Sequence, residues 1–232
     1  MDTQSLWYLE NIDVNGIFCP QKLGRGDMDA HPHKHYAKGE YIYLQEDESD
    51  KIFFLTEGRV KIGAIDADSG REITKAILSK GEVFGELAVM GEIKRRDFAY
   101  TMEPTTVCVL SVEDMQSLMR ERTGLNMFLM RIISARVLEL EQRLTSLVFK
   151  DSRTRVVEYL YHLGQTKGRV IGFEVLVNNF LNQEEIAQLT ATSRQTVNTA
   201  LNDLRDKKIL KFDRRRMLIH DMERLKGEIR GV

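Results

Sequence analysis

Apolar and polar residues alternate with a period of two in the first half of the chain. In the second half of the stretch KIFFLTEGRVKIGAID, Val60, Ile62 and Ala64 fall on one face of a strand. Gly58 marks the turn between this strand and the apolar run before it. Further strand-like runs, REITKAIL and TTVCVLSV, follow between glycines. From about residue 35 to residue 111, the pattern predicts short strands arranged as a sandwich or barrel.

The period changes to that of a helix after Ser111, which is suited to cap a helix and has Asp114 three residues on. Beyond Gly124, a long helix is predicted to run to about Lys150. Apolar residues along it are spaced in alternating steps of three and four, as in the seam of a coiled coil. The seam consists of Met130, Ile133, Val137, Leu140, Leu144 and Leu147.

Two features bear on how this seam is used. Leu129 and Ile132 add a second apolar face near the start of the helix, so the helix can serve both its own domain and a symmetry mate. Charged residues such as Glu139 and Arg143 flank the seam, which favours a dimer. The alternative is one wide stripe that faces the chain's own core.

The stretch LNQEEIAQLTATSRQTVNTALNDLRDKKIL predicts a helix, a tight turn and a second helix. Asn182 is suited to cap the first helix, and Ser193 the second. The buried face of the second helix is predicted to be Val197, Ala200, Leu201 and Leu204. Its outward face is predicted to be Arg194, Gln195, Asn198, Thr199 and Asn202.

This outward face is chemically suited to DNA. Arginine matches the two acceptors of guanine, and glutamine the donor and acceptor of adenine. The next stretch, KILKFDRRRMLIHD, predicts a hairpin whose basic tip would contact phosphates without reading sequence. The basic residues of this wing are Lys211, Arg214, Arg215 and Arg216. The alternative is an ordinary helical hairpin with a polar outer face.

The composition and the charge distribution are consistent with a chain of two domains. Apolar residues make up 42% of the chain, which is enough for a packed core. Residues 151–232 carry 15 Lys and Arg against 11 Asp and Glu, whereas residues 1–150 carry 19 against 24. A basic C-terminal part beside an acidic part fits a nucleic-acid reader joined to another module. Because neither a signal peptide nor a membrane span is recognised, a cytoplasmic protein without membrane contact is expected.

Cysteine and histidine residues allow a competing hypothesis. Cys19 and Cys108 alone exclude a disulfide framework and a cysteine-held iron–sulfur cluster, and Cys108 is expected to be a small core residue. His31, His33 and His35 alternate, so a strand would place all three imidazoles on one face, where they could bind a metal. His33, His35 and Glu40 loosely resemble the His-x-His and Glu pattern of a metal-dependent cupin enzyme. The alternative is a solvated strand entry, for which no metal is expected.

Three motifs resemble the cyclic-AMP receptor protein/FNR (Crp/Fnr) family of bacterial transcription regulators. TSRQTVNTALNDLRDKKIL is similar to its recognition helix and wing entry, GEVFGELAVMGE to its phosphate-binding cassette, and FKDSRTRVVEYL to its hinge. The resemblance implies an α+β protein with an N-terminal cyclic-nucleotide-binding-like β-roll (a double-stranded jelly roll) of eight strands. A long dimerisation helix and a C-terminal winged helix-turn-helix follow. The expected domains are residues 1–111 (β-roll effector domain), 112–150 (helical linker with the dimerisation coiled coil) and 151–232 (DNA-binding domain).

The resemblance also implies which residues contact DNA. Arg194, Gln195 and Thr199 occupy the base-contacting positions, and Ser193 and Thr196 the phosphate-contacting ones. The full set is Ser193, Arg194, Gln195, Thr196, Asn198, Thr199, Arg214, Arg215 and Arg216. Because cyclic-AMP receptor proteins carry arginine at the position of Thr199, the half-site is expected to lose or change a guanine contact. The implied partners are double-stranded DNA with a palindromic operator, a second copy of the chain, and RNA polymerase.

A phosphate pocket needs backbone amides at a helix start and a cation. Gly85 and the turn into Glu86 and Leu87 could supply the amides. By resemblance, Glu86 takes the ribose hydroxyl and Arg96 the phosphate. The next position, normally serine or threonine, is Asp97, whose carboxylate repels a phosphate and is expected to neutralise Arg95 or Arg96 instead.

A second departure lies on the long helix. In cyclic-AMP sensors, two hydroxyl residues ahead of the hinge phenylalanine contact adenine, and with Phe149 as the hinge these positions hold Leu140 and Glu141. Cyclic AMP is therefore not the expected effector. Another small anion or organic acid, no ligand at all, and a haem or redox signal stay open. The candidate effector-binding residues are Gly85, Glu86, Leu87, Arg95, Arg96, Leu140 and Glu141.

Overall fold

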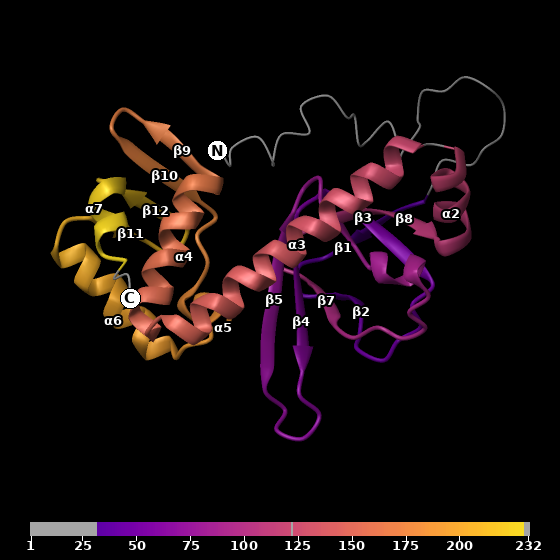
Figure 1. Cartoon of the computed structure of the whole chain (residues 1–232), viewed down its shortest axis with the longest axis horizontal. Helices are drawn as coiled ribbons and strands as arrows, with labels where there is room; N and C mark the ends of the chain where they lie inside the picture. The colour runs from indigo at the N-terminus through magenta and orange to yellow at the C-terminus, as the bar shows by residue number, and fades with distance from the viewer. Residues whose placement is uncertain (1–31, 122, 230–232) are drawn as a thin grey trace. The chain divides into compact units, whose positions relative to one another are not determined.

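The computed structural model describes residues 32–121 and 123–229 of the chain (Figure 1). They divide into two compact units, one ending at Met130 and the other beginning at Arg131, so the boundary falls within a single long helix. Each unit has its own secondary structure and its own core. In the described part of the chain, no helix is long and apolar enough to cross a membrane.

The first unit is built from two antiparallel sheets of four strands each. One sheet has the order β1 (His33–Tyr36), β8 (Thr105–Ser111), β3 (Lys51–Glu57), β6 (Val83–Phe84). The other has the order β2 (Tyr41–Tyr43), β7 (Phe98–Thr101), β4 (Arg59–Ile65), β5 (Glu72–Ser79). These eight strands confirm the predicted β-roll.

The core of this roll is aromatic and aliphatic. Phe53 and Phe84 stack with ring centroids 5.1 Å apart, and Tyr43 packs against both rings. Leu55 and Val60 are fully buried in the same cluster. Cys108 is buried as well, as predicted. Because the two sheets share this cluster, burial of apolar area stabilises the roll as one body.

Strand β4 departs from the predicted alternation at its end. Val60 and Ile62 are buried as predicted, but Ala64 is only half-buried and Gly63 is buried instead. The register with β5 shifts between Ile62 and Gly63, which is a β-bulge. A Cβ atom at Gly63 would lie 2.4 Å from the ring of Phe98, so only glycine fits this close approach.

The helix that follows the roll begins where the sequence indicates, whereas the long helix begins earlier. The Ser111 hydroxyl accepts a hydrogen bond from the Asp114 backbone N–H at 3.0 Å and so caps α2 (Val112–Glu121). The long helix α3 (Thr123–Phe149) follows at once, so Gly124 lies inside its first turn rather than before it. The predicted second apolar face is present, since Leu129 is buried and Ile132 half-buried.

The second unit places helices against a small antiparallel sheet. Its helices are α4 (Ser152–Lys167), α5 (Gln183–Leu189), α6 (Arg194–Asp206) and α7 (Met222–Gly227). The sheet has the order β11 (Leu210–Phe212), β12 (Arg216–Ile219), β10 (Glu174–Asn178), β9 (Gly168–Ile171). Leu160, Ile186, Leu201 and Ile219 are fully buried and join these elements into one core.

Candidate nucleic-acid interface and effector pocket

Helices α5 and α6 form the predicted helix, turn and helix. The Asn182 side chain accepts from the Glu185 backbone N–H, and the Glu185 carboxylate accepts from the Asn182 N–H, both at 2.9 Å. This capping box satisfies two backbone donors at the start of α5. Ala191 has a φ of 48°, in the left-handed region that a tight turn requires. Ser193 then caps α6 by accepting from the Thr196 N–H at 3.1 Å.

The two faces of α6 are divided as predicted. Val197, Ala200, Leu201 and Leu204 are at most 1% exposed, so the apolar side of the helix is completely covered. Arg194, Gln195, Asn198 and Thr199 are exposed on the other side, and Asn202 is half-buried. Burial of the apolar face fixes which side chains α6 presents to solvent.

Not every polar side chain on this face is equally available. The Asn198 side-chain oxygen accepts from the Gln183 amide at 3.1 Å and from the Asn202 amide at 3.3 Å. The hydroxyls of Ser193 and Thr196 lie 2.9 Å apart and hydrogen-bond each other. Within the described residues, the side chains of Arg194, Gln195 and Thr199 form no hydrogen bond or ion pair, so they are best placed to meet an external partner.

The wing is a hairpin of β11 and β12 with a basic tip, as predicted. The Asp213 carboxylate accepts from the backbone N–H groups of Arg215 at 2.7 Å and Arg216 at 2.8 Å. These backbone hydrogen bonds hold the pKa of Asp213 below its ordinary value. The carboxylate therefore shapes the turn, while the side chains of Lys211, Arg214, Arg215 and Arg216 stay exposed.

The candidate phosphate-binding segment begins with a glycine in the left-handed region. Gly85 has a φ of 73° and precedes the short 3₁₀ helix η2 (Glu86–Met90). A side chain at Gly85 would meet the Arg95 guanidinium at 2.7 Å, so glycine is required both for the backbone and for space. Glu86 is 8% exposed, whereas Leu87 points outward.

Arg95 lies inside the roll and not on its surface. Its guanidinium donates to the backbone carbonyls of Gly85 at 3.2 Å and Lys51 at 2.5 Å. It also lies 4.5 Å from the ring centroid of Tyr43 and 5.6 Å from that of Phe53. Arg95 is only 4% exposed, and it borders a hollow of about 220 Å³ that also has acidic residues in its wall.

Arg96 and Asp97 form ion pairs with two other residues and not with each other. Arg96 is exposed and pairs with Glu92. The prediction that Asp97 neutralises Arg95 or Arg96 is wrong, because its carboxylate pairs with Lys75 at 3.3 Å. Asp97 also accepts from the Tyr43 hydroxyl at 3.2 Å. Burial, followed by the charge of Asp97, raises the pKa of Tyr43 well above its ordinary value.

The seam of α3 is exposed along most of its length. Met130, Val137, Leu140, Leu144 and Leu147 are exposed, and Ile133 is half-buried. Leu138, Val148 and Phe149 are exposed as well, although the heptad pattern did not include them. Leu140 and Glu141, the candidate effector contacts on this helix, are both exposed. The exposed seam does not support the alternative of a stripe that faces the chain's own core from Val137 onward.

The histidine residues do not assemble a metal site among the described residues. The Nδ1 atom of His35 lies 3.0 Å from the Thr106 hydroxyl. Glu40, which the cupin hypothesis required, closes a turn by accepting from the Ala37 N–H at 2.8 Å. His31 and Cys19 lie outside the described residues.

Two arginines on α4 were not singled out from the sequence. Arg155 donates to the backbone carbonyls of Thr190 at 2.9 Å, Ala191 at 2.8 Å and Lys150 at 2.9 Å, so it holds the turn between α5 and α6. Arg153 forms ion pairs with acidic residues on or after α6 and α7. Apart from Lys150, the partners lie 35 to 75 positions away in the chain, so no local pattern could reveal those contacts.

Comparisons with known proteins cover both units. Residues 33–122 match the cyclic nucleotide-binding domain, and residues 154–228 match the Crp-like helix-turn-helix domain. The chain is 30% identical to the CRP-like cAMP-activated global transcriptional regulator of Mycobacterium tuberculosis, over 82% of this chain and 84% of that protein. It is 28% identical to the global nitrogen regulator of a Nostoc species, over 80% and 83%.

Solved structures agree with these relatives. A CooA variant from Carboxydothermus hydrogenoformans superposes with a TM-score of 0.75 at 28% identity, covering 86% of this chain and 88% of that one. FixK2 from Bradyrhizobium japonicum has the same fold, with a TM-score of 0.74. The relatives from Mycobacterium tuberculosis and Nostoc are regulators by name, and the hypothesis of a cupin-like enzyme is not supported.

Proposed function

This chain belongs to the Crp/Fnr family of bacterial transcription regulators, and from that premise we propose that it acts as a homodimer on a palindromic operator. Arg194, Gln195 and Thr199 contact the bases, and Ser193 and Thr196 contact phosphates. Arg214, Arg215 and Arg216 of the wing bind the flanking DNA backbone. The observation that carries this proposal is the exposed polar face of α6, whose opposite face is completely buried.

The chemistry of this face supports base recognition. A guanidinium can donate to both major-groove acceptors of guanine, and the Gln195 amide fits adenine. Both residues lie in the first turn of α6, which is the part of a recognition helix that reaches the bases first. Asn198 is held by Gln183 and Asn202, so it is assigned a supporting role. The wing arginines supply affinity that does not depend on sequence.

The exposed seam of α3 supports a dimer. Fully burying a Leu, Val or Met side chain contributes about 1.5–3 kcal/mol. Met130, Val137, Leu140, Leu144 and Leu147 therefore offer enough apolar surface for a second copy. A twofold pair of α6 helices then requires a palindromic operator, with half-sites about one helical turn apart.

The first unit is a sensor whose effector is not cyclic AMP, or a platform that acts without a ligand. Asp97 presents a carboxylate where a phosphate would need a donor, and this carboxylate is already paired with Lys75. Leu140 offers no polar contact to a base. A small anionic effector would bind near Gly85, Glu86 and Leu87, where Arg95 is the buried cation. The regulator works in the cytoplasm, where it meets its operator and RNA polymerase.

The decisive experiment is selection of duplexes from random DNA, followed by substitution of Arg194. We expect the native protein to enrich a palindrome, and Arg194→Ala to lose about 1–3 kcal/mol of binding free energy to it. Arg205→Ala is the matched control, because Arg205 is exposed on the same helix but beyond its DNA-facing turns. Equal affinity of Arg194→Ala and the native protein for the selected duplex would contradict the role of Arg194.

A further inference from the structure

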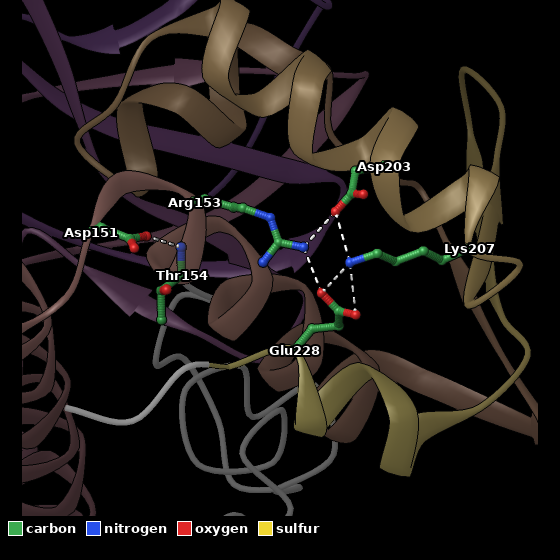
Figure 2. A network of polar contacts seen from close by, with 6 residues as sticks. All are labelled: Asp151, Arg153, Thr154, Asp203, Lys207 and Glu228. Atoms are coloured by element: carbon green, nitrogen blue, oxygen red, sulfur yellow. Dashed lines mark hydrogen bonds and ion pairs between the residues drawn. The ribbon is translucent and has the colours of Figure 1, made fainter.

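Four charged side chains form a closed network beside the recognition helix (Figure 2). One guanidinium nitrogen of Arg153 donates to Asp203 at 2.5 Å and to Glu228 at 2.6 Å. The Lys207 ammonium donates to both oxygens of Glu228, at 2.9 and 2.8 Å, and lies 3.3 Å from Asp203. The network thus joins the first turn of α4, the C-terminal half of α6 and the residue that ends α7.

The network is electrically neutral, with two cations and two carboxylates. The Lys207 hydrogen bond, and then that of Arg153, hold the pKa of Glu228 below its ordinary value. Arg153 and Lys207 act in the same way on Asp203. Burial of the Arg153 guanidinium works against its charge, but hydrogen bonds to the two carboxylates outweigh burial and raise its pKa. All four groups therefore stay charged at neutral pH.

The network shares a groove with the DNA-facing side chains. A hollow of about 580 Å³ is bordered by Arg153, Asp203 and Lys207 together with Ser193, Thr196 and Thr199. A DNA duplex that meets α6 would thus pass close to both cations. An unpaired lysine or arginine at that place attracts phosphate on DNA of any sequence. Binding of this kind raises affinity for all DNA and lowers selectivity.

We propose that Asp203 and Glu228 determine DNA specificity as positioning residues: they hold α6 against α4 and keep Arg153 and Lys207 from binding phosphates non-specifically. This inference rests on the proposed function, because it presupposes that α6 enters DNA. Glu228 is the more informative of the two carboxylates. It stands outside α6, and without it Arg153 and Lys207 still share Asp203, so its removal changes the charge more than the fold.

The test compares Glu228→Gln with Glu223→Gln in the full-length protein. Glu223 lies on α7, is exposed and has no ion pair among the described residues, so it controls for the loss of one negative charge. Each variant is titrated with a duplex selected from random DNA by the native protein and with a scrambled duplex, over a range of salt concentrations. We expect Glu228→Gln to bind the scrambled duplex about three- to tenfold more tightly and with a steeper salt dependence. The ratio of specific to non-specific affinity falls accordingly, whereas Glu223→Gln keeps the native ratio.

Two further variants separate charge from structure. Lys207→Gln leaves the network with one excess negative charge, and we expect a shift in the opposite direction, toward weaker binding of the scrambled duplex. The double variant Lys207→Gln with Glu228→Gln is neutral again, and we expect its ratio to return close to the native value. If the network acted only by stabilising the fold, the double variant would have a lower ratio of specific to non-specific affinity than either single variant.

The outcomes distinguish this inference from the function on which it rests. If the native protein selects no sequence from random DNA, the proposed function is wrong. If it selects a palindrome but Glu228→Gln keeps the native ratio and salt dependence, the role of the network is wrong. Thermal unfolding of each variant shows whether it is folded. If Glu228→Gln does not fold, the specificity ratio of Lys207→Gln tests the role of the network instead.

Discussion

At the scale of single residues, Asp97 bears on whether the first unit can bind a phosphate. Its carboxylate accepts from the Tyr43 hydroxyl and pairs with Lys75, so it is part of the wall of the roll. The side chain of Lys75 is 38% exposed and that of Asp97 is 21% exposed. A phosphate that approaches this site meets a negative charge, and the nearest cation is already neutralised.

Replacement of Asp97 by serine is expected to remove this repulsion. Serine can donate a hydrogen bond to a phosphate, and the negative charge at position 97 is gone. We expect millimolar cyclic AMP to leave the thermal unfolding temperature of the native protein unchanged and to raise that of Asp97→Ser. Asp68→Ser serves as a control, because it removes one negative charge from an exposed residue between β4 and β5 and leaves Asp97 in place. A native protein that is stabilised by cyclic AMP would refute the assignment.

Glu228 predicts a dependence of stability on pH. Its pKa is lower in the folded protein than in the unfolded chain, so its pairing stabilises the fold above the ordinary carboxyl range. This contribution is lost as the pH falls through the lowered pKa. We expect the free energy of unfolding of the native protein to fall more steeply in acid than that of Glu228→Gln. Chemical denaturation over an acidic pH series measures this difference, and identical acid limbs would contradict it.

At the scale of secondary-structure elements, α3 is a helix with an unmatched apolar seam. We expect Val137→Glu combined with Leu144→Glu to give monomers, because two charges in the seam would be buried against charges of the same sign. Gln142→Glu combined with Thr145→Glu is the matched control, since these exposed residues lie outside the seam. Size-exclusion chromatography with light scattering distinguishes the two. A native chain that is monomeric at every concentration would contradict the dimer.

The wing makes a different prediction from α6. Because the Arg215 side chain is exposed and only its backbone shapes the turn, Arg215→Ala should keep the fold. We expect it to weaken binding to all sequences about equally and to reduce the salt slope by about one. Titrations of the selected and scrambled duplexes at several salt concentrations measure both effects. A change confined to the selected duplex would mean that Arg215 reads bases.

The elements also show why some features could be predicted from sequence and others could not. The caps Ser111, Asn182 and Ser193 and the two faces of α6 depend on residues within one or two turns, so spacing alone indicated them. The bulge at Gly63 depends on the Phe98 ring from another strand. The pair of Asp97 with Lys75 likewise depends on how strands meet. Local periodicity carries no information on either contact.

At the scale of the whole molecule, the parts of the sequence before and after Lys150 have opposite charge balance. The excess of positive charge lies in residues 151–232, and there it is concentrated in the wing, while Arg153 and Lys207 are neutralised. Residues 1–150 carry an excess of negative charge, which opposes non-specific contact with DNA. We therefore expect affinity for DNA to be confined to a small part of the surface, as selective binding requires.

The carbonyl contacts of Arg155 have a consequence for how α6 responds to ionic strength. Arg155 holds the turn before the recognition helix through the neutral carbonyl groups of Thr190 and Ala191, whereas Arg153 holds the C-terminal half of that helix through the carboxylate of Asp203. Dissolved salt weakens the ion pair of Arg153 much more than the hydrogen bonds of Arg155 to carbonyl groups. Concentrated electrolyte should therefore loosen the polar attachment of the C-terminal half of α6 more than that of the turn before α6, while the buried apolar face keeps the helix in place.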